Sequence, residues 1–523
     1  MSNALTIIRS LVIYSLCLPL AIFLGYLLAM PMDAMSFTIV VSALCLPLLP
    51  LLLKHHHLLL FACWNTSIVL FFLPGRPNLG VVMTVVSLGL SILQHILNRD
   101  IRFVSVPSIT RPLIFLTLVI LMTAELTGGF GARLMGSESY GGKRYFILLG
   151  AIIGYFALAC FRIQPHKAMH YLALYLFGTV TSVVGNLAPY VSPSLYFLFA
   201  LFPVESLAFV EGGVGSQRLG GLTFASLATV CYVMARHGVR GLFDLGESWR
   251  LFPFRFKGGF GFNNPWRWLI FGGMLWIALL GGFRSIVIVF MLIFAFQFYL
   301  EGLCRTQLLP ALLLIGLLVA AIGLPMINRM PLMVQRSLSF LPVQVDPVAR
   351  TDADASSEWR LRMWQIVIPT VPQYLILGKG YSIDPNELNV ALDNTRRMGA
   401  SAAETAMLAG DYHNGPLSLI IPLGLFGVAG FLWFVFASVR VLLHNYRYGD
   451  PDLKGINTFL LAYFLARLVF FFTVFGSFHM EFMIFTGIVG ISVSFNGGMS
   501  PRPAPAPAEK PAFEQFKLAR ATR

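Results

Sequence analysis

The sequence predicts an all-α, polytopic helical membrane protein with about 12 to 14 transmembrane helices and one large periplasmic loop. Of its 523 residues, 57% are hydrophobic and 11% are charged, whereas soluble domains carry roughly 25% charged residues. Mean hydropathy is +0.77. The apolar stretches are continuous and reach the length of about 17 to 25 residues that crosses a bilayer as a helix. A transmembrane β-barrel would instead show alternating segments of roughly ten residues, so soluble enzymes and barrels are both excluded.

Apolar segments recur along nearly the whole chain. The first is too long for the apolar part of a signal peptide, so we expect a retained helix. Segment 191–209 is interrupted by Pro193, Pro203 and Glu205, and we expect it to be re-entrant or surface-lying. The expected membrane helices are 5–30, 35–53, 57–74, 79–97, 109–127, 144–163, 167–187, 219–236, 265–281, 284–300, 307–326, 415–437, 456–475 and 478–496.

The formal net charge of +14 is best explained by membrane topology. Lys and Arg punctuate the apolar segments, and they concentrate in short loops on the side that holds the N-terminus. Because such loops are retained in the cytoplasm, both termini and the basic loop 237–264 are expected there, and a nucleic-acid partner is not expected. The same parity puts the long loop 327–414 in the periplasm.

These segments divide the chain into five predicted regions. The second region carries Arg218 and Arg284, and the third ends at His413. The regions are N-terminal transmembrane helices at 1–190, further transmembrane helices at 191–326, the large periplasmic loop at 327–414, C-terminal transmembrane helices at 415–496, and a disordered cytoplasmic tail at 497–523 whose Pro-rich start favours polyproline II.

One motif stands at the end of the long loop. His413 and Asn414 are followed by nine residues and then by Gly424 and Gly427 in the run GLFG. This pattern resembles the signature of the O-antigen ligase and O-antigen polymerase superfamily of membrane glycosyltransferases. Further matches to the same family are the stretch EWRLRMWQIVIPTVPQYLILGKGY, which contains Arg360 and Trp364, the stretch GSQRLGGL with Arg218 and Leu222, and Arg284 at the outer start of a helix.

The resemblance, which covers roughly residues 200 to 495, implies a multi-pass protein of the bacterial inner (cytoplasmic) membrane. Such an enzyme transfers a glycan from undecaprenyl diphosphate to an acceptor hydroxyl at the periplasmic face, with inversion and without a metal or other cofactor. The acceptor is lipid A core for a ligase, a second lipid-linked glycan for an O-antigen or exopolysaccharide polymerase, and a protein for an O-oligosaccharide ligase. We favour the ligase, because the single His-Asn motif is explained most simply that way.

The resemblance assigns His413 as general base and Arg218 and Arg284 as ligands of the diphosphate. All three face the periplasm in the predicted topology. Arginine stays charged and grips two phosphate oxygens at once. Histidine has an ordinary pKa of about 6.5 and is mostly neutral at pH 7, as a base requires.

Each assignment has a plainer alternative. Arg284 could simply extend to the membrane interface, Arg218 could be an ordinary loop charge, and His413 could be an interfacial histidine. Gly424 and Gly427 are expected to permit close helix packing.

Weaker candidates surround this core set. Arg360 could contact phosphate or glycan, or cap an interfacial helix, and Asn414 could contact substrate. Arg467, within an apolar segment, could bind phosphate or pair with Glu481. Asp411 and Glu404 could orient His413 or the acceptor. The run His55, His56 and His57 is expected to be a solvated turn, and no metal is predicted at the single Asp33.

A polysaccharide flippase or other transporter is the alternative from a different class. It would show internal repeats and charges along a central cavity in both halves. Here the informative charges cluster at one face in the second half of the chain, which favours the enzyme over a transporter or an assembly protein.

Overall fold

The computed structural model describes residues 49–73, 75–98, 103–128, 141–203, 219–243, 265–383 and 410–501, with the single positions 25, 386 and 389. Within these ranges the chain forms helices and no β-strand; one isolated bridge joins Val69 and Asn78. The expected span 5–30, most of 35–53 and the tail after residue 501 lie outside the described residues. The predicted all-α fold class is confirmed.

The described α-helices follow one another along the chain in the order of the predicted segments. They are α3 (Leu49–Cys63), α4 (Leu79–Leu97), α5 (Pro107–Thr127), α6 (Lys143–Ala159), α7 (Pro165–Phe177), α8 (Ser182–Val191), α9 (Gly220–Phe243), α10 (Pro265–Leu279), α11 (Arg284–Leu300), α12 (Leu308–Gly323), α13 (Leu332–Leu338), α14 (Pro347–Val367), α17 (Gly415–Tyr448), α18 (Lys454–Thr473) and α19 (Phe478–Asn496).

Seven of the described helices are long and apolar enough to cross a membrane, and shorter apolar helices occupy Leu269–Leu279 and Arg284–Leu300. The ends of α4, α11 and α19 coincide with the predicted ones. In segment 191–209, the described part forms the 3₁₀ helix Pro193–Ala200, which at eight residues is too short to span the bilayer. A polytopic helical membrane protein is therefore the correct description.

The expected helix 57–74 is wrong. α3 ends at Cys63 and is followed by turns and irregular chain. Polar side chains explain the break: Asn65 Nδ2 donates to the Tyr175 carbonyl at 2.8 Å, and Asn78 Nδ2 donates to the Thr66 carbonyl at 2.7 Å. Side chains of this kind satisfy irregular backbone and compete with helix formation.

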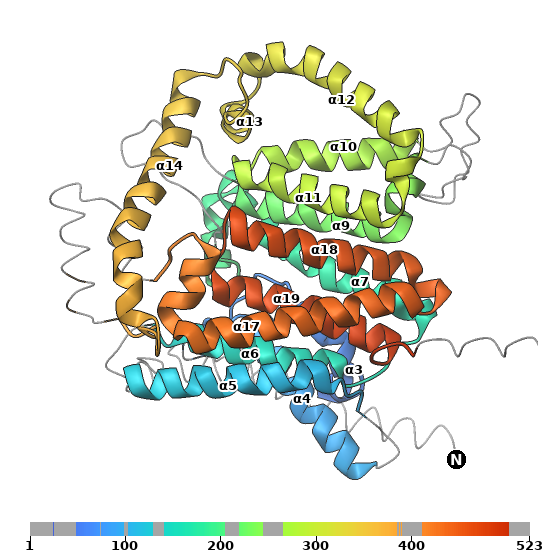
Figure 1. Cartoon of the computed structure of the whole chain (residues 1–523), viewed down its shortest axis with the longest axis vertical. Coiled ribbons are helices and arrows are strands. Elements are labelled where there is room, and N and C mark those ends of the chain that lie inside the picture. Colours follow the sequence, from blue (N-terminus) through green and yellow to red (C-terminus); the bar gives the residue numbers. More distant parts are fainter. Residues whose placement is uncertain are drawn as a thin grey trace, which may run out of the picture.

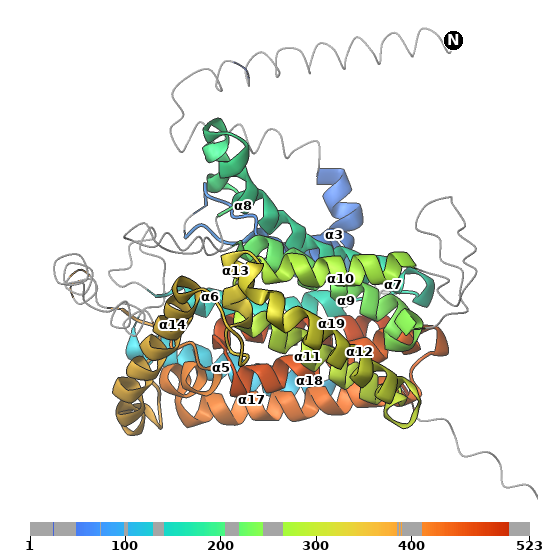
Figure 2. The ribbon, with the colours of Figure 1, turned by 90° about the horizontal axis from the view of Figure 1, so that it is seen from above.

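The long helices run roughly parallel, and one helix crosses their ends. Figures 1 and 2 both place α14 at one end of the bundle, nearly perpendicular to α11, α17 and α18. A phenylalanine-rich core lies between α17, α18 and α19, with Phe431, Phe464 and Phe485 fully buried. Packing of these aromatic rings fixes the positions of α17, α18 and α19 relative to one another. The helix ends that α14 crosses are therefore held in place.

α17 breaks near its start, at the first glycine of the sequence motif. Gly424 has φ +62, and a Cβ there would lie 2.4 Å from the Ile376 carbonyl oxygen. Segment 376–380 of the predicted periplasmic loop pairs with the chain at this break, because Lys379 N–H donates to the Ile421 carbonyl at 2.7 Å. Only glycine fits such a left-handed position against another backbone. The expected close packing is therefore present at Gly424, and Gly430, one turn beyond the motif, abuts Leu116 of α5, whereas the nearest atoms to Gly427 belong to Leu423 of its own helix.

Candidate active site

The candidate site lies where α14 crosses the bundle end. Arg284, the first residue of α11, holds the N-terminal half of α14: its Nη2 donates at 2.8 Å both to the Ala353 carbonyl and to Ser357 Oγ. A second arginine, Arg336 of α13, is buried and forms a 2.6 Å ion pair with Asp352 of α14. Two guanidinium groups thus fix α14 against the start of α11.

The C-terminal half of α14 holds the segment that carries His413. Trp364 Nε1 donates to the Tyr412 carbonyl at 2.8 Å. Met363, Val367, Tyr412 and Ile421 form a small buried apolar cluster between α14 and the start of α17. Because this cluster excludes water around the Tyr412 backbone, the position of His413 is set by packing as well as by the chain.

His413 is clamped between two aromatic rings. Its imidazole lies edge to face with Trp359 at a centroid distance of 5.0 Å, and 5.2 Å from the ring of Phe475. Its backbone has φ +47, a left-handed conformation that is uncommon for a residue with a side chain and occurs often at functional sites. The side chain keeps 23% of its surface exposed, so the ring is both oriented and accessible.

Charged neighbours tune this imidazole. Burial holds the pKa of His413 below its usual value of 6.5, Asp411 opposes that effect, and Arg360 adds to it. Nε2 lies 3.8 Å from Asp411 Oδ2, and Nδ1 is shielded from solvent with no hydrogen-bond partner within the described ranges. A neutral imidazole with an unsatisfied nitrogen and a carboxylate nearby can accept a proton and then be stabilised as imidazolium.

Arg360 connects the two halves of the site. Its guanidinium lies over the ring of Phe475 at 5.7 Å, and Phe475 also contacts His413. Ala353, Ser357 and Arg360 are spaced four and three residues apart on α14, so they share one helix face. Ser357 accepts a hydrogen bond from Arg284, and the charge of Arg360 acts on His413. These two residues of α14 are therefore about 5 Å apart along the helix axis.

Two weaker candidates have structural roles. Asn414 caps α17, since its Oδ1 accepts a 3.0 Å hydrogen bond from Leu417 N–H. Arg467 is buried in α18 and bonds Glu481 through both Nε and Nη2. Of the two roles expected for Arg467, the structure contains the pairing with Glu481.

Arg218 and Glu404 lie outside the described residues; α9 begins two residues after Arg218. Within the described ranges, no group of three or more His, Cys, Asp or Glu side chains is arranged to hold a metal ion. The diphosphate role of Arg218 and metal independence both stay predictions.

Sequence reasoning missed Arg144, the second residue of α6. Its guanidinium lies 5.7 Å from the ring centroid of Tyr381, and its Nη1 would be 2.7 Å from a Cβ on Gly410. Burial raises the pKa of Tyr412 to about 12, with Arg144 partly offsetting that shift. The segment 410–413 thus runs between Arg144 on one side and α14 on the other. The signal was present, because the predicted topology puts Arg144, like Arg284, at the outer start of a helix.

Comparison with known proteins gives a family match that includes part of this site. The comparison with curated proteins gives no significant match. A protein-family model described as O-antigen ligase matches residues 268–432. That range contains Arg284, Arg360, His413 and Asn414, and it leaves out Arg144, Arg218 and Arg467. The match supports an O-antigen ligase- or polymerase-family function in general terms for this multi-pass membrane protein, and residues 268–432 are similar to the O-antigen ligase family, in agreement with the superfamily that the sequence motifs predicted.

Proposed function

We propose that the protein transfers a glycan from undecaprenyl diphosphate to an acceptor hydroxyl at the periplasmic face of the bacterial inner membrane. The observation that carries the proposal is the shared helix α14, which Arg284 bonds and whose Trp359 packs on His413. Because one helix supports both Arg284 and His413, a cation and a base can act on the same substrate. A diphosphate leaving group needs the cation, and a hydroxyl nucleophile needs the base.

The proposed step is a single displacement with inversion. The acceptor oxygen attacks the anomeric carbon of the donor glycan while the bond from that carbon to the diphosphate oxygen breaks. The hydroxyl proton passes to His413, and the diphosphate leaves with the bonding electron pair. Asp411 then stabilises the imidazolium, in line with its effect on the pKa of His413.

Arginines meet the charge that develops on the leaving group. Arg284 and Arg218 are the proposed diphosphate ligands, and Arg360 and Arg144 flank the His413 segment from two sides. Because guanidinium groups present fixed, paired donors, they stabilise developing negative charge without reorganising. No metal is assigned to this step.

The acceptor we favour is lipid A core, which makes the enzyme an O-antigen ligase. An O-antigen or exopolysaccharide polymerase and a protein O-oligosaccharide ligase use the same donor chemistry and differ in the acceptor. The same base and cations would serve all three reactions, so the choice of acceptor is tested by assay.

The test is transfer by the purified full chain in vesicles with an undecaprenyl diphosphate-linked glycan. Lipid A core, a second lipid-linked glycan and an acceptor protein are supplied in parallel, each with and without EDTA. We expect transfer to lipid A core that EDTA leaves unchanged. Transfer only to another acceptor would reassign the subtype, and glycan crossing the vesicle without transfer would favour a transporter. Loss with EDTA that magnesium restores would contradict metal independence.

A further inference from the structure

A cavity of about 820 Å³ lies at the opposite end of α17 from His413. Its lining comes mainly from the C-terminal half of α17, with Leu468 of α18 and the segment Met499–Pro501. Val435, its first lining residue on α17, is separated from His413 by about 30 Å of helix. The cavity is therefore distinct from the candidate active site and, in the predicted topology, lies toward the cytoplasmic side.

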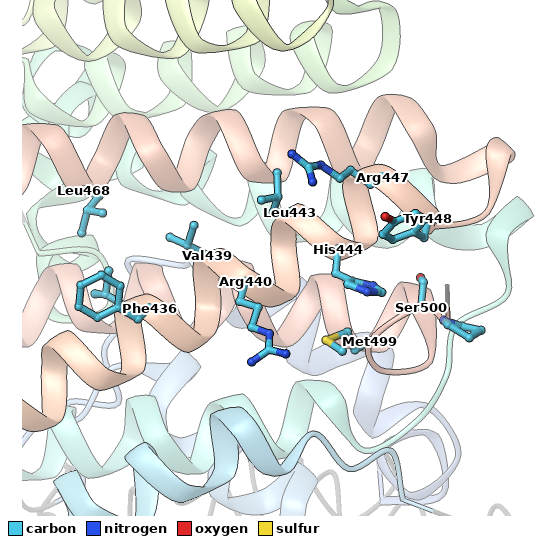
Figure 3. Close-up of a pocket in the computed structure, with 12 residues that line it drawn as sticks. Phe436, Val439, Arg440, Leu443, His444, Arg447, Tyr448, Leu468, Met499 and Ser500 are labelled. Carbon is cyan, nitrogen blue, oxygen red and sulfur yellow. The ribbon is translucent and has the colours of Figure 1, made fainter. Parts of the chain in front are cut away.

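The lining is apolar at one end and basic at the other. Val435, Phe436 and Val439 begin the stretch, and Arg440, His444 and Arg447 complete it. These basic residues are spaced four and three apart, so they share one helix face. Figure 3 shows the guanidinium groups of Arg440 and Arg447 on two sides of Leu443 and His444. The arrangement suits an amphiphile with an anionic head.

The basic groups have no anionic partner in the part of the chain that the structure describes. Arg440 and Arg447 are exposed and take part in no ion pair or hydrogen bond there. The Nδ1 atom of His444 is shielded from solvent and has no hydrogen-bond partner among the described residues, while its ring packs on Tyr448 with centroids 4.7 Å apart. Three hydrogen-bonding side chains thus line the cavity, and no described protein group satisfies them.

We propose that this cavity binds an anionic phospholipid of the cytoplasmic leaflet, with the headgroup along the basic stretch from Arg440 to Arg447 and the first acyl carbons along Phe436 and Val439. Its volume lies within the range of about 300 to 1,000 Å³ that holds small ligands. Basic pockets between membrane helices on the cytoplasmic side bind such headgroups. The predicted topology puts the C-terminal end of α17 on that side, and this assignment does not depend on the transfer reaction.

The chain's own tail is a poorer occupant. Residues 502–523 directly follow the lining residue Pro501 and carry five Lys or Arg against two Glu. A basic segment is repelled by Arg440 and Arg447, whereas a phosphodiester is attracted to them. Charge complementarity therefore favours lipid over tail.

The test is native mass spectrometry of the purified full chain titrated with phosphatidylglycerol and, separately, with phosphatidylcholine. We expect preferential binding of phosphatidylglycerol, reduced roughly five-fold by Arg440→Gln and by Arg447→Gln, since one basic residue near a lipid surface contributes about 1 kcal/mol. Arg305→Gln is the matched control, because Arg305 is also exposed and basic and lies outside the cavity. Thermal unfolding without added lipid verifies that each variant is folded.

Two additional arms separate the other occupants. Soluble glycerol 3-phosphate should not displace the lipid, and a chain ending at Pro501 should still bind it. Equal binding of phosphatidylcholine, or an equal loss in Arg305→Gln, would overturn the site. Full displacement of the lipid by glycerol 3-phosphate would show a site for free anions. A large gain in lipid binding on removal of the tail would show that the tail occupies the cavity. Either result contradicts the proposal.

Discussion

The indole of Trp359 and the imidazole of His413 meet edge to face, with ring centroids 5.0 Å apart and an angle of 63° between their planes. Phe475 closes the opposite side of the imidazole. An edge-to-face contact of this kind stabilises a defined ring orientation. Because Trp359 belongs to α14 and Phe475 follows α18, the orientation of His413 depends on how α14 is held to the bundle.

The pH dependence of transfer should respond in opposite directions to the two charges beside His413. Transfer needs the neutral imidazole, so its rate falls as pH drops through the pKa of His413, which burial holds below 6.5. Asp411 raises that pKa and Arg360 lowers it. Asp411→Asn should therefore move the acid limb of the rate profile to lower pH, and Arg360→Gln should move it to higher pH.

The control for this pair is Arg362→Gln. Arg362 is exposed on the same helix and pairs with Glu358 at 2.6 Å, so its loss should leave the acid limb in place. The readout is the midpoint of the acid limb in kcat/KM between pH 4 and 8, a range that extends about 2.5 units below and about 1.5 units above an ordinary histidine pKa of about 6.5. Movement of both variants in the same direction would contradict His413 as the titrating group.

Arg284 should not be replaceable by lysine. An ammonium presents a point charge without the planar fork that holds two phosphate oxygens, so Arg284→Lys should lose about tenfold or more in transfer rate. Ser357→Ala removes one hydrogen bond that Arg284 makes to α14 and should retain most of the rate. If Ser357→Ala and Arg284→Lys lost activity equally, Arg284 would be an anchor for α14, and its diphosphate role would be rejected.

Arg467 is expected to stabilise the fold through Glu481 and not to bind phosphate. Glu481→Ala leaves a buried guanidinium without its partner, and we expect a loss of about 3 to 5 kcal/mol in unfolding free energy. The double variant Arg467→Met with Glu481→Leu should regain stability, because apolar side chains of similar volume can replace a buried ion pair. Transfer by that stable double variant should be near normal; a folded but inactive protein would restore Arg467 as a phosphate contact.

Arg144 should contribute to transfer although it lies outside the matched family segment. Arg144→Gln removes the cation beside the 410–413 segment, and a lost hydrogen bond to a charged group corresponds to roughly a 10- to 100-fold drop in kcat/KM. Lys143→Gln is the matched control, since Lys143 is exposed at the same helix start and donates to the Arg76 carbonyl at 3.2 Å. Equal effects of the two changes would indicate general surface charge instead of a specific contact.

Helices whose ends coincide with a change in hydropathy could be predicted closely, and buried polar contacts could not. α4, α11 and α19 begin and end as expected. The solvated turn expected at His55–His57 was wrong: this run lies in α3, and His56 is buried with its Nδ1 3.0 Å from Ser87 Oγ. A polar group satisfied by a partner 31 residues away leaves no local pattern in the sequence.

The candidate site divides in the same way. His413 and Arg284 could be predicted because they stand in sequence motifs. Their common support by α14 could not be predicted, because it depends on a hydrogen bond from Trp364 to a carbonyl 48 residues later. Arg144 reaches the site through its contacts with Tyr381 and Gly410, which are remote from it in the sequence. Sequence motifs therefore identify residues with a chemical role, whereas contacts between residues remote in the sequence determine which charged side chains lie near one another.

The most direct test of the account is glycan transfer by His413→Ala in vesicles, with His413→Gln as a variant that retains hydrogen bonding. His413 lies at a loop end with its side chain partly exposed, so both proteins should fold and insert normally, which thermal unfolding can verify. We expect both to lose roughly 10²- to 10⁴-fold in rate, the usual contribution of a general base. Near-normal transfer by a stably inserted His413→Ala protein would contradict the central claim that His413 takes the proton from the acceptor hydroxyl.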